Sequence, residues 1–333
     1  MIIAGTAMNK IVILLLLAML PGFGVAVQAQ QTARLPRVAR LSPSTAAADE
    51  IMLAGFRQGL KEHGWIENKN IILEYRFADG KIERLNELAA ELARLKVDII
   101  LSGATVGAQA AKRASSTIPI VMVTTGDPVA AGLVASLARP GSNLTGVTAL
   151  GQELSGKRLQ LLKEALPGIN HVAVLSNPTN PDSKFSVKEV EAAANELGVK
   201  LRLYEASDPT KFEGAFRTMS AERAGAVLVL TDSMLFTHRK RIVELAAQNR
   251  VPAMYPISEY ATAGGLMFYG ANFPDMYRRA AAFVDKILKG TRPADLPVEQ
   301  AQRFELIINL KAAKQIGMTI PPNVLARADR VIR

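Results

Sequence analysis

Two short polar loops follow apolar segments in the first half of the chain and carry residue types suited to ligand binding. Residues 102–105 read Ser-Gly-Ala-Thr and place a hydroxyl where a helix would begin. Unpaired backbone N–H groups and the positive end of the helix dipole favour an anion there, for example a carboxylate. Residues 124–128 repeat the arrangement, with Asp127 suited to cap a helix and Pro128 to its first turn. Each of these residues taken singly also fits an ordinary turn or cap.

Acidic residues that follow predicted strands are the candidates for binding an ammonium group. Asp127 lies in the first half of the chain, and Asp232 and Glu259 follow neighbouring predicted strands in the second half. If the ligand is an amino acid, Ala104 and Thr105 would hold its carboxylate, and Asp232 and Glu259 are the preferred pair for its ammonium group. The alternative is that both acidic residues cap the helices after them.

The candidate ligand-binding residues share one position, in or beside a loop that follows a predicted strand. They are Ser42, Ser44, Gly103, Ala104, Thr105, Thr125, Asp127, Asn177, Asp232, Tyr255 and Glu259. The sequence favours no catalytic or metal site: it has no cysteine, and its three histidines are far apart. The glycine-rich dinucleotide fingerprint, the phosphate-binding loop and the Gly-x-Ser-x-Gly nucleophile motif are absent. We therefore expect a binding protein without a cofactor.

Strands and helices alternate along the chain, which predicts an α/β fold with parallel sheets. Strands are predicted at 37–41, 71–76, 97–101, 118–123, 171–175, 200–205, 226–230 and 252–255. Alanine-rich helical segments are predicted after the third and the fourth of these strands. The polar loops would gather at the carboxyl edge of each sheet, where open α/β folds bind ligands. Some 300 residues exceed one typical core, so we expect two lobes, each a doubly wound parallel sheet flanked by helices.

The N-terminal segment has the features of a secretory signal peptide. Lys10 precedes a short apolar run, and small residues end at Ala29. We predict a signal peptide over residues 1–29, with cleavage after Ala29 or, alternatively, Ala26. A membrane anchor is the other reading, but an apolar stretch of about ten to sixteen residues is short for a span of about 20. Without a cysteine to carry a lipid, the mature protein is expected to be soluble in the periplasm.

The net charge of +10 could attract nucleic acid, but the basic residues are dispersed along the chain. No aromatic-studded basic patch or zinc module accompanies them. We therefore predict no nucleic-acid partner and interpret the charge as a solvated surface.

Several separated segments resemble one family of bacterial extracytoplasmic solute-binding proteins. The likeness is carried by Ser-Thr-Ile-Pro-Ile-Val at 116–121, Gly-Asp-Pro-Val at 126–129, the segment 132–147, and further matches at 56–60, 264–267, 285–290 and 304–309. This family serves ABC importers and is often labelled as the binding component for tryptophan or tyrosine transport. The resemblance implies a small-molecule ligand, an ABC permease and its ATPase as partners, membrane contact only through the permease, and a monomer.

The resemblance also implies a type I periplasmic-binding-protein-like fold whose chain crosses three times between the lobes. On that pattern the first lobe comprises residues 36–147 and 265–292, and the second lobe residues 150–262 and 296–333, with the ligand cleft between them. Hinge closure around a carboxylate-bearing solute would then deliver the solute to the permease. The alternative function is a ligand-sensing domain that partners a sensor kinase or chemoreceptor.

Overall fold

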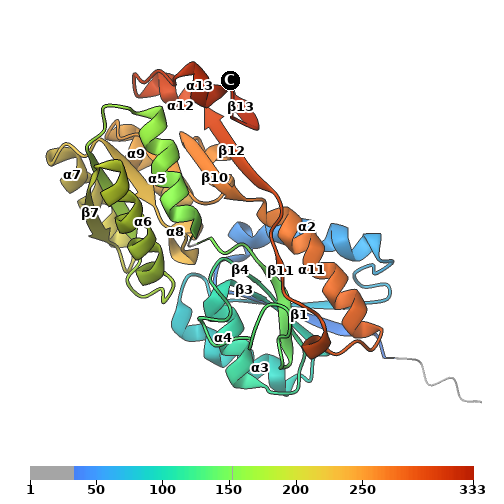
Figure 1. Ribbon diagram of the computed structural model, residues 1–333. Helices are drawn as coiled ribbons and strands as arrows, with labels where there is room; N and C mark the ends of the chain where they lie inside the picture. The colour runs from blue at the N-terminus through green and yellow to red at the C-terminus, as the bar shows by residue number, and fades with distance from the viewer. Residues whose placement is uncertain (1–33, 152) are drawn as a thin grey trace, which may run out of the picture. The chain divides into compact units, whose positions relative to one another are not determined.

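Two β-sheets flanked by helices organise the chain (Figure 1). This computed structural model describes residues 34–151 and 153–333, and the predicted signal peptide lies outside the described residues. The predicted α/β class is confirmed. No helix in the described part of the chain combines the length and the apolar composition that a membrane span requires.

The first sheet has six strands, all paired in parallel, in the order β11-β5-β4-β3-β1-β2. They are β1 (Arg37–Ser42), β2 (Ile72–Phe77), β3 (Ile99–Gly103), β4 (Ile120–Thr124), β5 (Leu144–Thr148) and β11 (Glu299–Gln300). Every residue of β3, β4 and β5 is buried, because helices cover both faces of this sheet. Their near-continuous apolar runs follow from that position.

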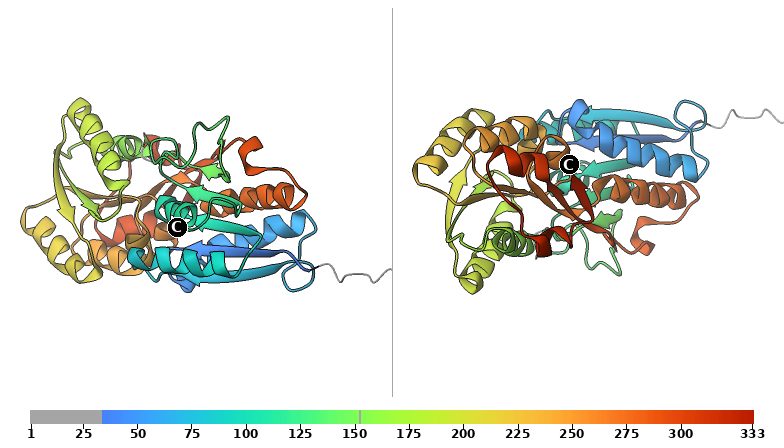
Figure 2. Two further views of the ribbon diagram at one scale, coloured as in Figure 1. Left: turned by 90° about the horizontal axis from the view of Figure 1, so that it is seen from below. Right: turned by 90° about the horizontal axis from the view of Figure 1, so that it is seen from above.

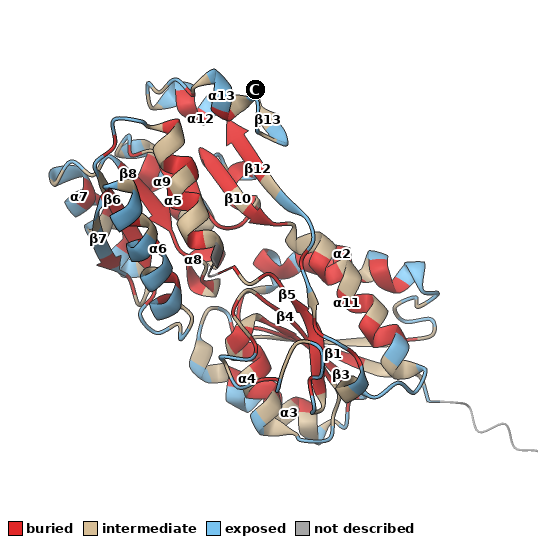
Figure 3. Cartoon of the chain, in the orientation of Figure 1, coloured by how far each residue is buried: buried red, intermediate tan, exposed pale blue. Residues whose placement is uncertain are grey.

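The second sheet has seven strands in the order β13-β12-β10-β9-β8-β6-β7, parallel except for the β10–β12 pair. They are β6 (His171–Ser176), β7 (Lys200–Glu205), β8 (Ala226–Val229), β9 (Ala253–Tyr255), β10 (Met267–Ala271), β12 (Phe304–Asn309) and β13 (Arg330–Ile332). Figure 3 shows the central strands buried and the outward faces of the covering helices exposed.

Helices pack on both sheets and bury their apolar faces against them. The α-helices are α2 (Ala46–Glu62), α3 (Leu85–Arg94), α4 (Ala104–Ala114), α5 (Glu153–Ala165), α6 (Ser183–Leu197), α7 (Phe212–Ala221), α8 (Ser233–Thr237), α9 (Arg239–Gln248), α10 (Glu259–Thr262), α11 (Phe273–Leu288), α12 (Leu310–Gln315) and α13 (Pro322–Leu325). Single 3₁₀ turns cover Ile82–Arg84, Pro209–Lys211 and Pro293–Asp295. Residues of α3 and α4 share one apolar cluster with the first sheet, whereas α2 and α11 share another cluster on its opposite face.

The chain passes between the two sheets three times along its described length, but two crossings differ from the predicted boundaries. We expected residues 265–292 to lie with the first sheet, yet β10 pairs with β9 and β12 in the second, so the return begins at α11. We expected 296–333 to lie with the second sheet, yet β11 pairs with β5 in the first. Hydrophobic periodicity could not show that β11 and β12, which follow each other closely in the sequence, belong to different sheets.

One predicted helix is absent from the structure. An alanine-rich helix was predicted after β4, but residues 128–139 form turns and bends there. Asp127 does accept hydrogen bonds from the N–H groups of Val129 and Ala130, as a capping residue would. Gly132 then takes a φ of 67°, a left-handed conformation that ends helices, and the chain turns inward to bury Leu133. Asp127 therefore caps the segment as its position predicts, but Gly132 ends the turn before a helix can form.

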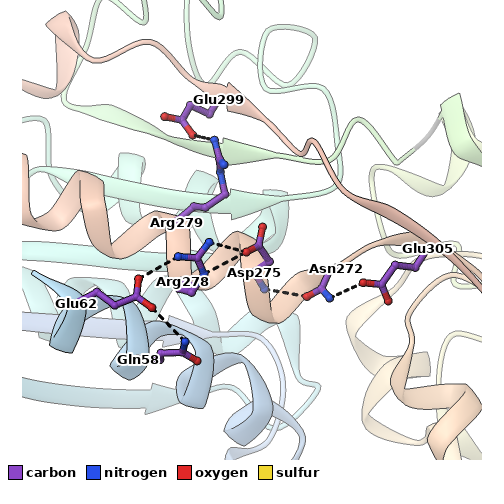
Figure 4. A network of polar contacts seen from close by, with 8 residues as sticks. All are labelled: Gln58, Glu62, Asn272, Asp275, Arg278, Arg279, Glu299 and Glu305. Atoms are coloured by element: carbon purple, nitrogen blue, oxygen red, sulfur yellow. Dashed lines mark hydrogen bonds and ion pairs between the residues drawn. The ribbon is translucent and has the colours of Figure 1, made fainter. Parts of the chain in front are cut away.

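Helices α2 and α11 lie side by side although more than 200 residues separate them in the sequence (Figures 1 and 2). A methyl group at Gly59 of α2 would come within 2.2 Å of the Arg278 carbonyl oxygen of α11, so this approach requires glycine. Figure 4 shows polar contacts that continue the packing: Arg278 Nη1 donates to Glu62 Oε2 at 3.0 Å, and Asn272 Nδ2 donates to Glu305 Oε1 of β12 at 2.9 Å. The start of α11 is thereby fixed between the two sheets.

Candidate ligand-binding site

A cavity with an empty volume of about 710 Å³, part of it open to solvent, lies at the carboxyl ends of strands from both sheets. Ligand sites in α/β proteins form at this edge of the sheet. Seven of the predicted site residues line it: Ser42, Ser44, Gly103, Ala104, Thr105, Thr125 and Asp232. The structure thus brings together loops after β1, β3, β4 and β8. Whether these residues contact a ligand stays a prediction.

Four predicted site residues do not line this cavity. The carboxylate of Asp127 instead accepts the N–H groups of the turn that follows it. Asn177 lies behind the cavity wall and donates from Nδ2 to Asp232 Oδ2 at 3.2 Å. Tyr255 is fully buried and stacks on Tyr260, with ring centroids 4.7 Å apart. Glu259 lies in the first turn of α10, where Ser258 Oγ donates to its Oε2, and burial raises the pKa of its carboxyl.

The start of helix α4 forms one wall of the cavity. Gly103 is its N-cap, and no side chain among the described residues caps it. Ala104 has a φ of 56°, a conformation that costs a non-glycine residue about 1–3 kcal/mol and that concentrates at functional sites. By contrast, Thr45 Oγ1 at the start of α2 accepts a hydrogen bond from the Ala48 N–H. The α4 terminus therefore presents uncapped N–H groups and a positive dipole end to the cavity.

Arg40 of β1 adds a buried cation to the same wall. Its Nε and Nη2 donate to the two carboxylate oxygens of Asp49 at 2.8 and 2.7 Å, and Nη2 also donates to Tyr277 Oη of α11 at 2.8 Å. Ser42 Oγ donates to Asp49 as well, at 3.1 Å. Burial alone would lower the pKa of Arg40, but the Asp49 charge and these hydrogen bonds raise it, so the guanidinium stays charged. The ion pair is 3 % and 5 % exposed, which makes it a fixed part of the fold.

The opposite wall, from the second sheet, carries carboxylates. Asp232 follows β8 and caps α8, since its Oδ1 accepts from the Leu235 N–H at 2.8 Å. Its Oδ2 accepts from the amides of Asn177 and Asn180 at 3.2 and 3.1 Å. Asp232 therefore does cap the helix that follows it, which was the alternative to ligand binding in the sequence analysis. Burial nevertheless raises the pKa of Asp232 above its usual 3.8, because these neutral donors only partly offset desolvation.

Asp182, in the loop before α6, connects the two walls. Thr105 Oγ1 of α4 donates to its Oδ2 at 2.7 Å and lies 2.8 Å from Thr124 Oγ1. Both Asp182 oxygens would lie 2.8 Å from a methyl group placed on Gly126, so only glycine leaves room for the carboxylate here. Burial raises the pKa of Asp182, against the lowering effect of the Thr105 hydrogen bond.

Sequence reasoning missed several cavity residues, some within strand-following loops and some outside them. The polar ones include Arg40, Asp49, Asn180, Asp182 and Tyr277, and apolar ones include Met52, Ile82, Val106, Phe236, Ile257 and Phe273. Two of them had a signal in the sequence. Arg40 is a charged residue within the apolar run of β1, and Asp182 lies close to Asn177, between β6 and α6. Tyr277 and Phe273 reach the cavity only through the crossing of α11. No cluster of metal-ligating residues is found in the described chain.

The chain belongs to the ABC transporter substrate binding protein family, whose model matches residues 44–332. A curated "Tyrosine-binding protein" of Clostridioides difficile strain R20291 is 26% identical over 265 residues, which cover 79% of this chain and 76% of that protein.

Two solved structures are similar to this chain over most of its length. A conserved domain protein from Vibrio cholerae is 29% identical with a TM-score of 0.84, covering 90% of this chain and 100% of that chain. A domain from Streptococcus pneumoniae in complex with L-Trp is 24% identical with a TM-score of 0.82, covering 90% of this chain and 100% of that one, a likeness that shows the fold alone. The fold is that of the type I periplasmic binding proteins, and more distant solute-binding proteins share it.

Proposed function

We propose that this chain is the extracytoplasmic solute-binding protein of an ABC importer, and that it captures an amino acid, with aromatic amino acids as the leading candidates. In this proposal a cleavable signal peptide exports the chain to the periplasm, where two lobes close on the ligand and present it to the permease and its ATPase. No cofactor takes part. The lobes correspond to the two sheets with their helices, corrected at β10 and β11 as described above.

One observation carries the choice of ligand, namely the opposite polarity of the two cavity walls. The first wall offers hydrogen-bond donors and positive potential from the α4 terminus, beside the ion pair of Arg40 and Asp49. The second wall offers the carboxylates of Asp182 and Asp232, whose pKa values are raised by burial. An α-carboxylate and an α-ammonium group would satisfy these two walls together. A sugar has no charge to place on either wall.

The ligand class is supported further by the relatives. The protein of Clostridioides difficile is named for tyrosine binding, and a protein of the same fold was solved with L-Trp. The apolar remainder of the cavity, which includes Met52, Phe236 and Phe273, suits a hydrophobic side chain. A ligand that touches both walls would stabilise the closed arrangement, which is the signal that a permease reads.

A thermal-shift screen of amino acids, organic acids and sugars tests the proposal. Ligand at a thousandfold excess over its dissociation constant adds about 4 kcal/mol of stability, so a few amino acids should raise the melting temperature clearly. A screen in which sugars raise it and every amino acid fails would contradict the proposal. Export is tested separately: protein recovered from the periplasm should begin at Gln30, after cleavage at Ala29.

A further inference from the structure

Strand β2 forms an outer edge of the first sheet, since within the described chain it pairs with β1 alone. The N–H groups of Ile72 and Ala78, at the two ends of the strand, donate to the segment that contains β1. Successive residues of a strand alternate in direction, so the backbone N–H and C=O groups of Leu73, Tyr75 and Phe77 point away from β1. No group among the described residues accepts these three N–H hydrogens.

This free stretch is short, because the chain leaves the strand at both ends. Before β2, the Asn68 N–H donates to the Ile71 carbonyl at 2.8 Å, so the preceding loop already uses that carbonyl. After β2, the Gly80 N–H donates to the Pro43 carbonyl at 2.8 Å, which turns the chain back toward the loop after β1. The exposed edge therefore fits a partner strand about as long as β2 itself.

The two charged residues of β2 have opposite signs and share one face of the strand. Arg37 Nη2 donates to Glu74 Oε1 at 2.6 Å, and Arg76 Nη2 donates to Glu91 Oε1 at 2.7 Å. If two β2 strands paired antiparallel with Tyr75 facing its own copy, Glu74 of each chain would lie opposite Arg76 of the other. Centring the contact on Glu74 or on Arg76 would oppose like charges, which is destabilising. The β2 edge is thus complementary to itself in the register centred on Tyr75.

The other face of β2 carries its apolar side chains, and they suit the same register. The rings of Tyr75 and Phe77 are stacked, with centroids 6.2 Å apart and planes 5° from parallel. All six residues of β2 are half-buried. In the register centred on Tyr75, Leu73 would lie opposite Phe77 and the two Tyr75 rings would face each other. Such cross-strand aromatic and aliphatic pairs stabilise a sheet.

We propose that two copies of this chain associate through their β2 edges, with the strands antiparallel about Tyr75, so that the first sheets of both copies form one continuous sheet. The same surface is used on each copy, so the contact closes at a dimer. In each central pair the outward N–H and C=O groups would satisfy one another.

No residue of β2 lines the cavity. The inference therefore does not depend on the proposed function, and it departs from the monomer that the family resemblance implies. Charged residues on an edge strand can instead keep copies apart. A monomer is accordingly the result that overturns the inference.

Sedimentation velocity of the purified protein over a dilution series tests the inference. Wild-type protein should sediment as a dimer that dissociates on dilution. Glu74→Arg and Arg76→Glu each place like charges opposite one another twice per dimer, so each should weaken association at least about tenfold. The double variant Glu74→Arg, Arg76→Glu restores opposite charges across the contact and should regain most of the association.

Mixing the two single variants gives the sharpest result. A Glu74→Arg chain that faces an Arg76→Glu chain has opposite charges at both positions, so the mixture should form dimers although neither variant does so alone. Arg241→Glu is the matched control, because it removes a partly exposed pair with Glu213 far along the chain, and it should sediment as wild type. Thermal unfolding confirms that each variant is folded.

Three results would overturn the inference. They are a wild type that sediments as a monomer at every concentration, a dimer that neither single variant weakens, and a mixture that behaves as its two components do separately. None of these results concerns ligand binding, so each would leave the proposed function standing.

Discussion

The starts of helices α4 and α8 face the same cavity from different sheets, and they are built in opposite ways. Helix α4 begins at Gly103 and Ala104 without a side-chain cap, although its backbone is strained there. Helix α8 begins at Asp232, whose carboxylate accepts the Leu235 N–H and two side-chain amides. The first start leaves donors available, and the second brings an acceptor that its own helix does not fully neutralise.

This difference shows how a cavity acquires polarity from ordinary helix termini. A cap satisfies backbone N–H groups and removes their attraction for an anion, whereas a missing cap preserves that attraction. In the proposed function, one terminus of each kind on opposite walls would suit a molecule with two opposite charges. The Thr105–Asp182 hydrogen bond, at 2.7 Å, joins the two walls directly through a hydroxyl and a carboxylate.

The largest expected effect comes from removing the anion of the first wall. Asp49→Ala would leave the Arg40 guanidinium buried and unpaired, and losing one partner of such a pair costs about 3–5 kcal/mol. Urea unfolding should show this loss of stability in the ligand-free protein. Asp295→Ala breaks an exposed pair with Arg292 and should leave the unfolding midpoint nearly unchanged. Equal effects of the two changes would mean that Arg40 is not held as a buried cation.

The next effect concerns the carboxylates of the second wall. Asp182→Asn and Asp232→Asn should each weaken binding of an amino acid by about 2 kcal/mol, because the ammonium group would lose a buried charged partner. The sequence instead paired Asp232 with Glu259, which does not line the cavity. Titration calorimetry on Glu259→Gln separates the two assignments. A loss equal to that of Asp232→Asn, with Asp182→Asn unaffected, would restore the pair expected from the sequence.

A smaller effect is expected where the walls meet at Gly126. Gly126→Ala would place a methyl group 2.6 Å from Thr105 Oγ1 and 2.8 Å from both Asp182 oxygens, so the carboxylate must move outward. We expect about 1–2 kcal/mol weaker ligand binding, the typical cost of forcing atoms into a packed site. Gly214→Ala adds its methyl group to open space on helix α7 and should stabilise the protein slightly without changing affinity. Unchanged affinity in Gly126→Ala would show that Asp182 is not needed in its present position.

The smallest effect is a dependence on pH from Asp182 and Asp232. Their folded pKa values lie above the usual 3.8, so just above pH 3.8 the folded chain holds more protons than the unfolded chain. Their contribution to the free energy of unfolding therefore decreases as pH rises through that window. Affinity for an ammonium ligand should increase over the same window, because the ligand favours the ionised carboxylates. Calorimetry between pH 4 and 7 on wild type and on the double variant Asp182→Asn, Asp232→Asn should show that increase only in the wild type.

Much of this architecture could be predicted from the sequence because parallel strands and their loops leave local signals. Apolar runs precede Ser42, Gly103 and Thr125, and helix-capping residues follow them. This pattern predicted that the three residues lie at one edge of a sheet, and all three line the cavity. Tyr277 could not be predicted in this way, since it reaches the cavity only because α11 returns to pack on α2. The placement of β10 and β11 failed for the same reason: a strand of two to five residues carries no signal of which sheet it joins.

Asp182 and Asp232 illustrate a second limit. From the sequence alone, a carboxylate just before a helix is as consistent with helix capping as with ligand binding. Only its burial and the geometry of its hydrogen-bond donors separate the two roles. Asp232 turns out to cap α8 and to line the cavity as well.

The central claim, that uncapped N–H groups on one wall and carboxylates on the other hold a zwitterion, is tested most directly by titration calorimetry with L-tyrosine and two analogues. Tyramine lacks the carboxylate, and 3-(4-hydroxyphenyl)propionate lacks the ammonium group, while both keep the aromatic ring. We predict that tyrosine binds and that each analogue binds at least about tenfold more weakly, because each leaves one wall with buried charge or donors unsatisfied. Binding of either analogue as tightly as tyrosine would contradict the account, since the corresponding wall would then contribute nothing to recognition.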